Sequence, residues 1–103
     1  MYSVVLSTCK NEKEAKTIAN VLLKEKLVAC VNIIGKIQSM AWWKNKIISS
    51  EEHLLIIKTK KSHVNEVIST IKKNHSYKVP EIIELPIGKG DKDYLDWISE
   101  VTK

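Results

Sequence analysis

The chain has 103 residues, with 17 lysines and arginines against 12 aspartates and glutamates, so its formal net charge is +5. That length fits one domain over residues 1–103, because roughly 100 residues bury an adequate core without disulfides. Hydrophobic residues make up 44% and charged residues 28%, which excludes a disordered or fibrous protein. No apolar run approaches the ~18 residues of a membrane helix, and the N-terminus lacks the pattern of a signal peptide. We therefore expect a cytoplasmic protein without a membrane partner.

The positive charge does not indicate a nucleic-acid partner. All basic residues are lysines, whereas nucleic-acid readers favour the bidentate fork of arginine. The lysines alternate with acidic residues, as in KNEKEAK and DKDYLD, which is typical of a solvated surface. An RNA-binding domain of this size would also need aromatic residues on its central strands, and residues 54–59 contain none.

The first third of the chain predicts a strand, a helix and a second strand. Residues 2–7 alternate and are rich in Val and Leu, as in a strand. Asn11 followed by Glu14 resembles a capping box, and apolar residues then recur at helical spacing to about Lys26. Residues 28–34 are β-branched and apolar, and alternation continues unusually far, to Trp43. We expect a hairpin turn there, with Asn45 at positive φ.

The remaining residues predict a third strand, a helix, a fourth strand and a terminal helix. The run from 54 to 57 is typical of a central strand, and Ser62 is expected to cap the next helix. Residues 75–81 form a polar connection before a strand over 82–87. Pro86 in that strand must occupy a position where sheet pairing requires no backbone N–H donor. Asp91 or Asp93 is expected to cap the final helix.

The order β-α-β-β-α-β predicts an α+β fold of the ferredoxin-like type, with an antiparallel sheet, an extended hairpin and a C-terminal helix. The strands around the hairpin are too long for so small a sheet, so their tips should project as a ribbon. The ribbon carries six large hydrophobic residues: Ile37, Met40, Trp42, Trp43, Ile47 and Ile48. Exposed apolar edges invite pairing, so we expect burial against another copy of the chain.

The residues suited to metal chemistry are few. Cys9 ends the first strand, where we consider a metal or redox role beside plain packing, whereas Cys30 reads as a core residue. His75 shares its connection with Tyr77 and Glu81, and neutral imidazole is a good ligand for copper, zinc or nickel. A capping or interface role for His75 is the alternative. Sequence motifs of nucleotide binding and of hydrolases are missing.

Several segments together resemble the CutA divalent-cation tolerance proteins over nearly the whole chain. These segments are LVACVNI at 27–33, the ribbon from 39 to 43, Glu52 with IKT at 57–59, His75 to Glu81, and YLDWI at 94–98. The resemblance implies a tight homotrimer, a link to tolerance of copper and other divalent metals, and an architecture similar to PII signalling proteins. It implies a sensing or regulatory module rather than an enzyme.

The resemblance also implies site residues. His75 occupies the position of a histidine that is a proposed copper ligand in the family. Our predicted metal ligands are His75, Cys9 and Glu81. Some members have a strand-one Cys where this chain has Ser7, and Ser76 replaces a usual Pro. The family positions expected to line a cleft between subunits are Trp43, Glu52, Lys58, Tyr77 and Pro80. Trp43 and Trp97 are alternatively packing residues of the interface.

Our leading interpretation is a homotrimeric protein that binds copper or another divalent cation weakly, with an unidentified small molecule or signalling protein as a further partner. The alternative is an enzyme that uses Glu81, Tyr77 and His75 on a small molecule in the cleft between subunits.

Overall fold

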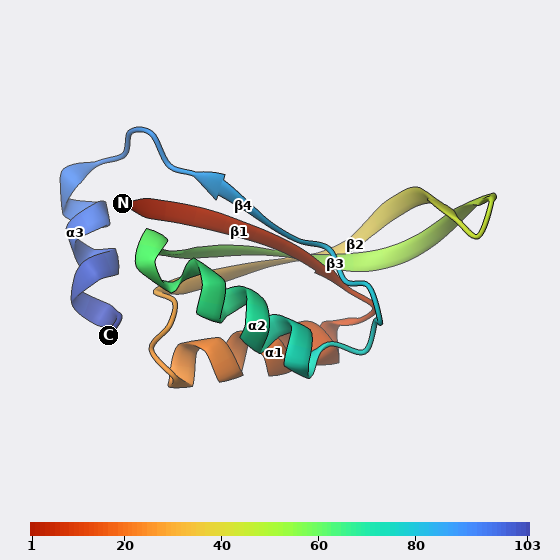
Figure 1. Cartoon of the computed structure of the whole chain (residues 1–103), viewed down its shortest axis with the longest axis horizontal. Coiled ribbons are helices and arrows are strands. Elements are labelled where there is room, and N and C mark those ends of the chain that lie inside the picture. The colour runs from red at the N-terminus through yellow and green to blue at the C-terminus, as the bar shows by residue number, and fades with distance from the viewer.

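Four strands form one antiparallel sheet in the order β2-β3-β1-β4 (Figure 1). The computed structural model describes all residues from 1 to 103. The strands are β1 (Tyr2–Cys9), β2 (Cys30–Trp43), β3 (Lys46–Lys60) and β4 (Ile82–Pro86). The apolar β3 lies between β1 and β2, as predicted. Pro86 is the last residue of the edge strand β4, where a proline is tolerated because the edge requires fewer N–H donors. The predicted ferredoxin-like α+β fold is confirmed.

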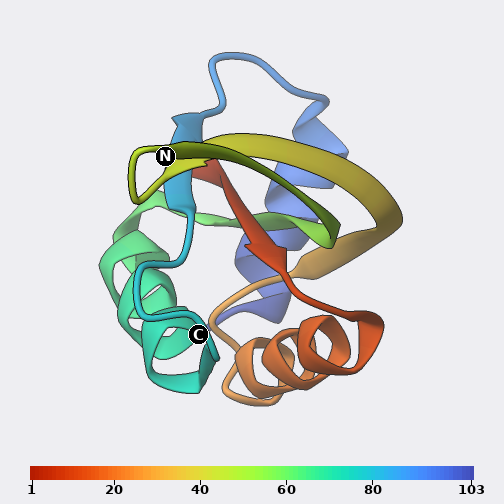
Figure 2. The same cartoon turned by 90° about the vertical axis from the view of Figure 1, so that its right-hand side faces the viewer.

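Two helices cover one face of this sheet. Helices α1 (Glu12–Lys24) and α2 (Val64–Asn74) lie side by side on that face, while α3 (Lys92–Val101) lies at the far end and contacts β3 (Figures 1 and 2). The core between helices and sheet consists of twelve buried residues: Val5, Cys9, Ala15, Ile18, Leu22, Leu27, Val28, Leu55, Ile57, Val64, Val67 and Ile71. None of the helices has the length and apolar character needed to cross a membrane.

Two of the three helices begin at an N-cap residue that the sequence predicts. Asn11 caps α1, because its side-chain oxygen accepts a hydrogen bond from the Glu14 amide at 2.9 Å. Asp91 caps α3 in the same way through the amide of Tyr94. The expected Ser62 cap is wrong. Residues Lys61–His63 form a short 3₁₀ turn, and α2 starts directly from it without a side-chain cap.

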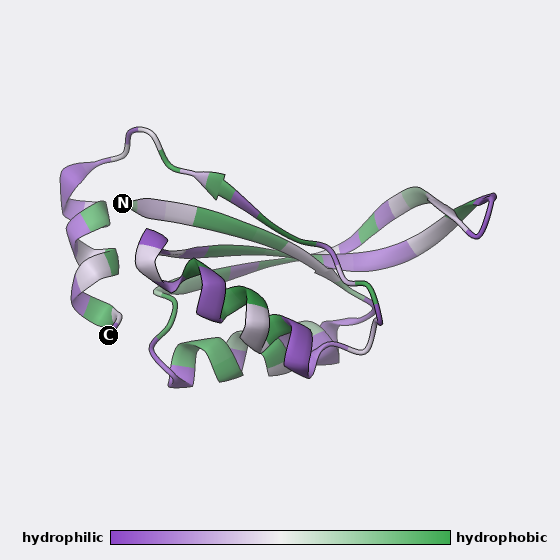
Figure 3. Ribbon diagram, in the orientation of Figure 1, coloured by the Kyte–Doolittle hydropathy of each residue, from purple (hydrophilic) through white to green (hydrophobic).

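The paired strands β2 and β3 continue beyond the sheet as a twisted ribbon, seen at the right of Figure 1. Lys44 and Asn45 form its turn with φ values of 49° and 64°, so Asn45 adopts the predicted left-handed conformation and Lys44 shares it. Hydrophobic and hydrophilic stretches alternate along this ribbon (Figure 3). Trp42 is 72% exposed and Ile47 62% exposed, so the ribbon is projecting and uncovered within one chain, as expected.

Candidate functional site

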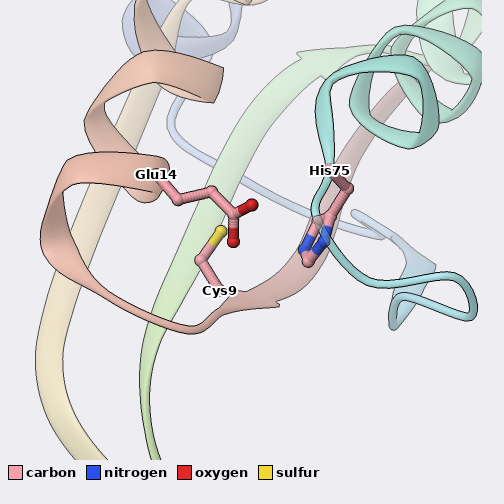
Figure 4. Close-up of side chains that lie close together, drawn as sticks. All are labelled: Cys9, Glu14 and His75. Atoms are coloured by element: carbon pink, nitrogen blue, oxygen red, sulfur yellow. The ribbon is translucent and has the colours of Figure 1, made fainter.

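Cys9, Glu14 and His75 meet where β1 passes into α1. One sulfur, oxygen or nitrogen atom from each lies within 4.8 Å of the others (Figure 4). Cys9 is the last residue of β1, the Asn11 cap places Glu14 in the first turn of α1, and His75 follows the last residue of α2. The fold therefore brings together donors from three parts of the chain. These three residues are the donor cluster.

The ring of His75 is held by hydrogen bonds at both nitrogens. Nε2 lies 2.7 Å from the carbonyl oxygen of Thr8, and Nδ1 accepts a hydrogen bond from the Tyr77 amide at 3.0 Å. A carbonyl oxygen only accepts and a backbone amide only donates, so Nε2 carries the proton and the ring is neutral. Neutral imidazole is the form that ligates metals, but here a metal must displace one of these hydrogen bonds.

Glu14 connects the helix start to the segment after His75. One of its oxygens accepts from the Ser76 amide at 2.7 Å and the other from the Lys10 amide at 3.3 Å. Glu14 therefore accepts a hydrogen bond from the amide of Lys10. In a capping box it would accept from the amide of Asn11 instead. Burial acts to raise the pKa of this carboxyl, but the hydrogen bonds from Ser76 and Lys10 outweigh it and hold the pKa below its usual value. Glu14 is therefore a carboxylate at neutral pH.

Cys9 is fully buried and keeps its proton. Burial, followed by the negative charges of Glu14 and Glu52, raises the pKa of its thiol to about 12. Sulfur, imidazole nitrogen and carboxylate oxygen are together a donor set that suits copper or zinc. A divalent cation would fit these donor types, but it must compete with the thiol proton and with the hydrogen bonds of His75 and Glu14. Any such binding is weak and strengthens as the pH rises.

A cavity of about 430 Å³ lies between the ribbon and the segment from Tyr77 to Val79. We call it the ribbon cavity. The residues that line it are Ser39, Ala41, Trp43, Ile48, Ser50, Glu52, Tyr77, Lys78 and Val79. The Tyr77 hydroxyl donates to the Glu52 carboxylate at 2.8 Å. Burial and then this carboxylate raise the pKa of Tyr77, so its hydroxyl stays protonated.

The structure brings together only part of the residue sets predicted from the sequence. Cys9 and His75 meet, but the carboxylate beside them belongs to Glu14, and the exposed Glu81 lies outside this cluster. Sequence reasoning missed Glu14 as a donor, although its position three residues after Asn11 marked it as part of the helix start.

The predicted cleft set is likewise divided. Trp43, Glu52 and Tyr77 line the ribbon cavity, whereas Lys58 and Pro80 do not. Lys58 donates instead to the side-chain oxygen of Asn32 on the neighbouring strand β2.

Comparison with known proteins gives concordant matches. A family model described as CutA1 divalent ion tolerance protein matches residues 3–101. The divalent-cation tolerance protein CutA of Thermus thermophilus is 41% identical over 102 residues, which cover 99% of both chains. Protein CutA of Homo sapiens is 42% identical over 101 residues, which cover 98% of this chain. This chain spans 56% of the human protein and 56% of the chloroplastic Protein CutA 1 of Oryza sativa, just over half of each.

The structural comparison agrees. The structure of the periplasmic divalent cation tolerance protein CutA from Archaeoglobus fulgidus is 41% identical, covers all of both chains and gives a TM-score of 0.97. The CutA structure from Thermus thermophilus gives 0.96 at the same identity. These names describe tolerance of an ion rather than a reaction. From the full-length family match and these identities, the chain belongs to the CutA1 family of divalent ion tolerance proteins.

Proposed function

We propose that this protein acts in divalent-cation tolerance as a binding or sensing module, and that it takes copper or a related divalent cation at Cys9, Glu14 and His75. One observation carries the proposal: a thiol, a carboxylate and an imidazole offer ligand atoms within 4.8 Å of one another. Three protein donors leave further coordination positions for water or a partner's ligand. We propose no catalytic step, because the ring nitrogens of His75 and the hydroxyl of Tyr77 are all held in hydrogen bonds.

Weak binding follows from the state of each donor. The Cys9 thiol must lose its proton, and the raised pKa makes that loss unfavourable at neutral pH. His75 must release either Thr8 or Tyr77. A protein that responds only when a metal is abundant needs such a site, since a preformed high-affinity site would be filled at all times.

We also propose that the working form is a cytoplasmic homotrimer. The uncovered hydrophobic side chains of the ribbon support self-association, because an isolated two-stranded ribbon is marginally stable in water. Cys9 and Cys30 are both free thiols, which supports a reducing compartment.

Copper titration followed by visible absorption tests the metal proposal. The wild type is expected to bind Cu²⁺ more tightly at pH 8.5 than at pH 7, and His75→Ala is expected to lose this binding. His63→Ala is the matched control, because His63 lies at the start of α2 and its ring contacts the carbonyl of Lys103 instead. Unchanged titration of His75→Ala would reject His75 as a ligand and the proposed site with it.

The ribbon cavity favours a second candidate function, an enzyme or sensor that acts on a small molecule. Its volume of about 430 Å³ falls within the range of small-molecule sites. Of the residues predicted for such an enzyme, Tyr77 lines the cavity and Glu81 does not. Native mass spectrometry of the purified protein would support this candidate if it detected a bound metabolite that Trp43→Ala releases.

A further inference from the structure

The inference concerns His53 on β3, whose ring has a nitrogen without a partner. Nδ1 of this ring is buried within the chain and makes no hydrogen bond. Most buried polar side-chain atoms have a partner, so such a nitrogen requires an explanation. Because Nδ1 is already out of contact with solvent in one chain, a second copy that covers the ribbon cannot reach it. Its partner is therefore to be sought inside the fold.

His53 lies directly opposite Cys9 in the sheet. The register of β1 and β3 pairs these two residues. Directly paired residues of an antiparallel sheet carry their side chains on the same face, with β-carbons about 4.5–5.5 Å apart. Cys9 belongs to the core between helices and sheet and also to the donor cluster. The imidazole of His53 and the thiol of Cys9 are thus neighbours on the helix-covered face.

The contact of His53 with β2 shows how its ring is turned. A β-carbon added to Gly35 on β2 would lie 2.9 Å from Nε2 of His53 and 3.2 Å from Cδ2, so this edge of the ring faces β2. In an imidazole ring, Nδ1 is the atom opposite the edge between Nε2 and Cδ2. Nδ1 is therefore turned away from β2. The neighbour of β3 on the other side is β1, the strand that carries Cys9.

A cation bound at the donor cluster needs a further ligand of this kind. Zinc almost always takes four ligands, and the donor cluster supplies three. A deprotonated Cys9 and an ionised Glu14 carry two negative charges, which neutralise a divalent cation. The remaining ligand should then be neutral, because an unbalanced charge is costly inside a protein. A neutral imidazole nitrogen meets this condition and ligates both zinc and copper.

We propose that His53 is the fourth protein ligand of the cation site, so that Cys9, Glu14 and two imidazoles surround the ion. His53 lies outside the atoms that approach within 4.8 Å of one another, so its side chain turns toward the ion on binding, while the Cys9 thiol releases its proton to solvent. Sulfur and two imidazoles favour zinc and copper over Mg²⁺ and Ca²⁺, which prefer oxygen. The inference rests on the proposed cation site and adds the residue that sets its ion preference.

Titration with Co²⁺ followed by visible absorption tests the proposal, because four-coordinate Co²⁺ absorbs far more strongly than six-coordinate Co²⁺. The wild type is expected to give the intense spectrum. His53→Val should bind Co²⁺ at least about tenfold more weakly, since even residues that only orient a ligand contribute this much to metal affinity. Valine suits a central strand, so the variant should fold. His63→Ala is the matched control, because the His63 ring contacts the carbonyl of Lys103 instead.

The stability of the metal-free protein separates a ligand from a structural residue. His53→Val removes a buried nitrogen without a partner, so urea denaturation should find the metal-free variant at least as stable as the wild type. Weaker Co²⁺ binding together with a less stable metal-free variant would assign His53 to the fold and overturn the proposal. Should His53→Val fail to fold, ¹⁵N NMR of the Zn²⁺-loaded wild type decides the matter, and an Nδ1 resonance of His53 that zinc leaves unshifted overturns it.

The proposed cation site and the role of His53 fail in different ways. Unchanged Co²⁺ binding by His53→Val, with binding lost in His75→Ala, would overturn the role of His53 and leave the site of three donors standing. A wild type that binds no Co²⁺, or a His75→Ala variant that binds it as the wild type does, would overturn both.

Discussion

At the scale of single residues, buried hydroxyl groups differ in whether they have a partner. Thr59 is fully buried and donates to the carbonyl of Leu27 at 2.6 Å. Ser7 is fully buried on the helix-covered face of β1, and its hydroxyl has no hydrogen-bond partner. A buried hydroxyl without a partner costs about 1–3 kcal/mol relative to water, so the two positions should respond to substitution in opposite directions.

We predict that Ser7→Ala raises the free energy of unfolding by about 1 kcal/mol, because it removes an unpaired polar atom and leaves only a small void. Thr59→Val, which nearly keeps the side-chain volume, should lower it by about 1–2 kcal/mol because the Leu27 carbonyl loses its donor. Urea denaturation of both variants measures the difference. A destabilised Ser7→Ala variant would mean that the serine hydroxyl has a partner after all.

Glu14 should make stability depend on pH. The pKa of its carboxyl in the folded chain lies below the usual value near 4.5, so folding favours the ionised form. The resulting stabilisation is present above about pH 4.5 and disappears as the pH falls through the folded-state pKa. We predict that Glu14→Gln is less stable than the wild type at pH 7 and that the difference shrinks below about pH 4. Denaturation at a series of pH values tests this, and a difference that stays constant with pH would contradict it.

At the scale of elements, the irregularity in β2 stands out. The pairing of β2 with β3 shifts register between Ile34 and Ile37, and Lys36 within it has φ of 57°. A β-carbon added to the adjacent Gly35 would lie 2.9 Å from Nε2 of His53, so this glycine lets β2 pass close to β3. The irregularity lies where the sheet ends and the ribbon begins.

We predict that Lys36→Gly stabilises the protein by up to about 1 kcal/mol, because glycine adopts positive φ without the strain of a side chain. Lys46→Gly is the matched control. Lys46 starts β3 without positive φ and should lose stability when replaced. Thermal unfolding of both variants gives the comparison. A loss of stability in Lys36→Gly as large as in the control would show that position 36 is not strained.

The sequence predicts the elements better than their contacts. Strand alternation, helical spacing and the caps at Asn11 and Asp91 are local patterns, and the structure agrees with them. The predicted cap at Ser62 is wrong because Ser62 lies inside a 3₁₀ turn. The residues around a serine do not distinguish such a turn from a helix cap. The donor cluster depends on how α1 and the segment after α2 meet β1 in space. Cys9 and His75 could be proposed by residue type, whereas the meeting of Glu14 with both is a tertiary contact.

At the scale of the whole molecule, one chain leaves much hydrophobic surface uncovered. Along the ribbon, Met40 is 70% exposed, Trp43 50% and Ile48 41%. The short edge strand β4 also exposes Ile83 and Leu85. Patches of this kind on a small protein mark surfaces that bind another protein. A second copy of the chain would cover them with surfaces of the same character, which is why we propose the homotrimer.

Trp43→Asp should disrupt this assembly, because it places a charge in an apolar contact without a partner. Trp42→Asp tests the other face of the same strand, since successive side chains of a strand point to opposite sides. The two variants together would show which face of the ribbon the neighbouring copy covers.

Sedimentation equilibrium of the wild type at micromolar concentration measures whether copies of the chain associate to cover the ribbon. We predict a single species with three times the 11.8 kDa mass of one chain, and a smaller species for Trp43→Asp. A well-folded wild-type species of 11.8 kDa would contradict it.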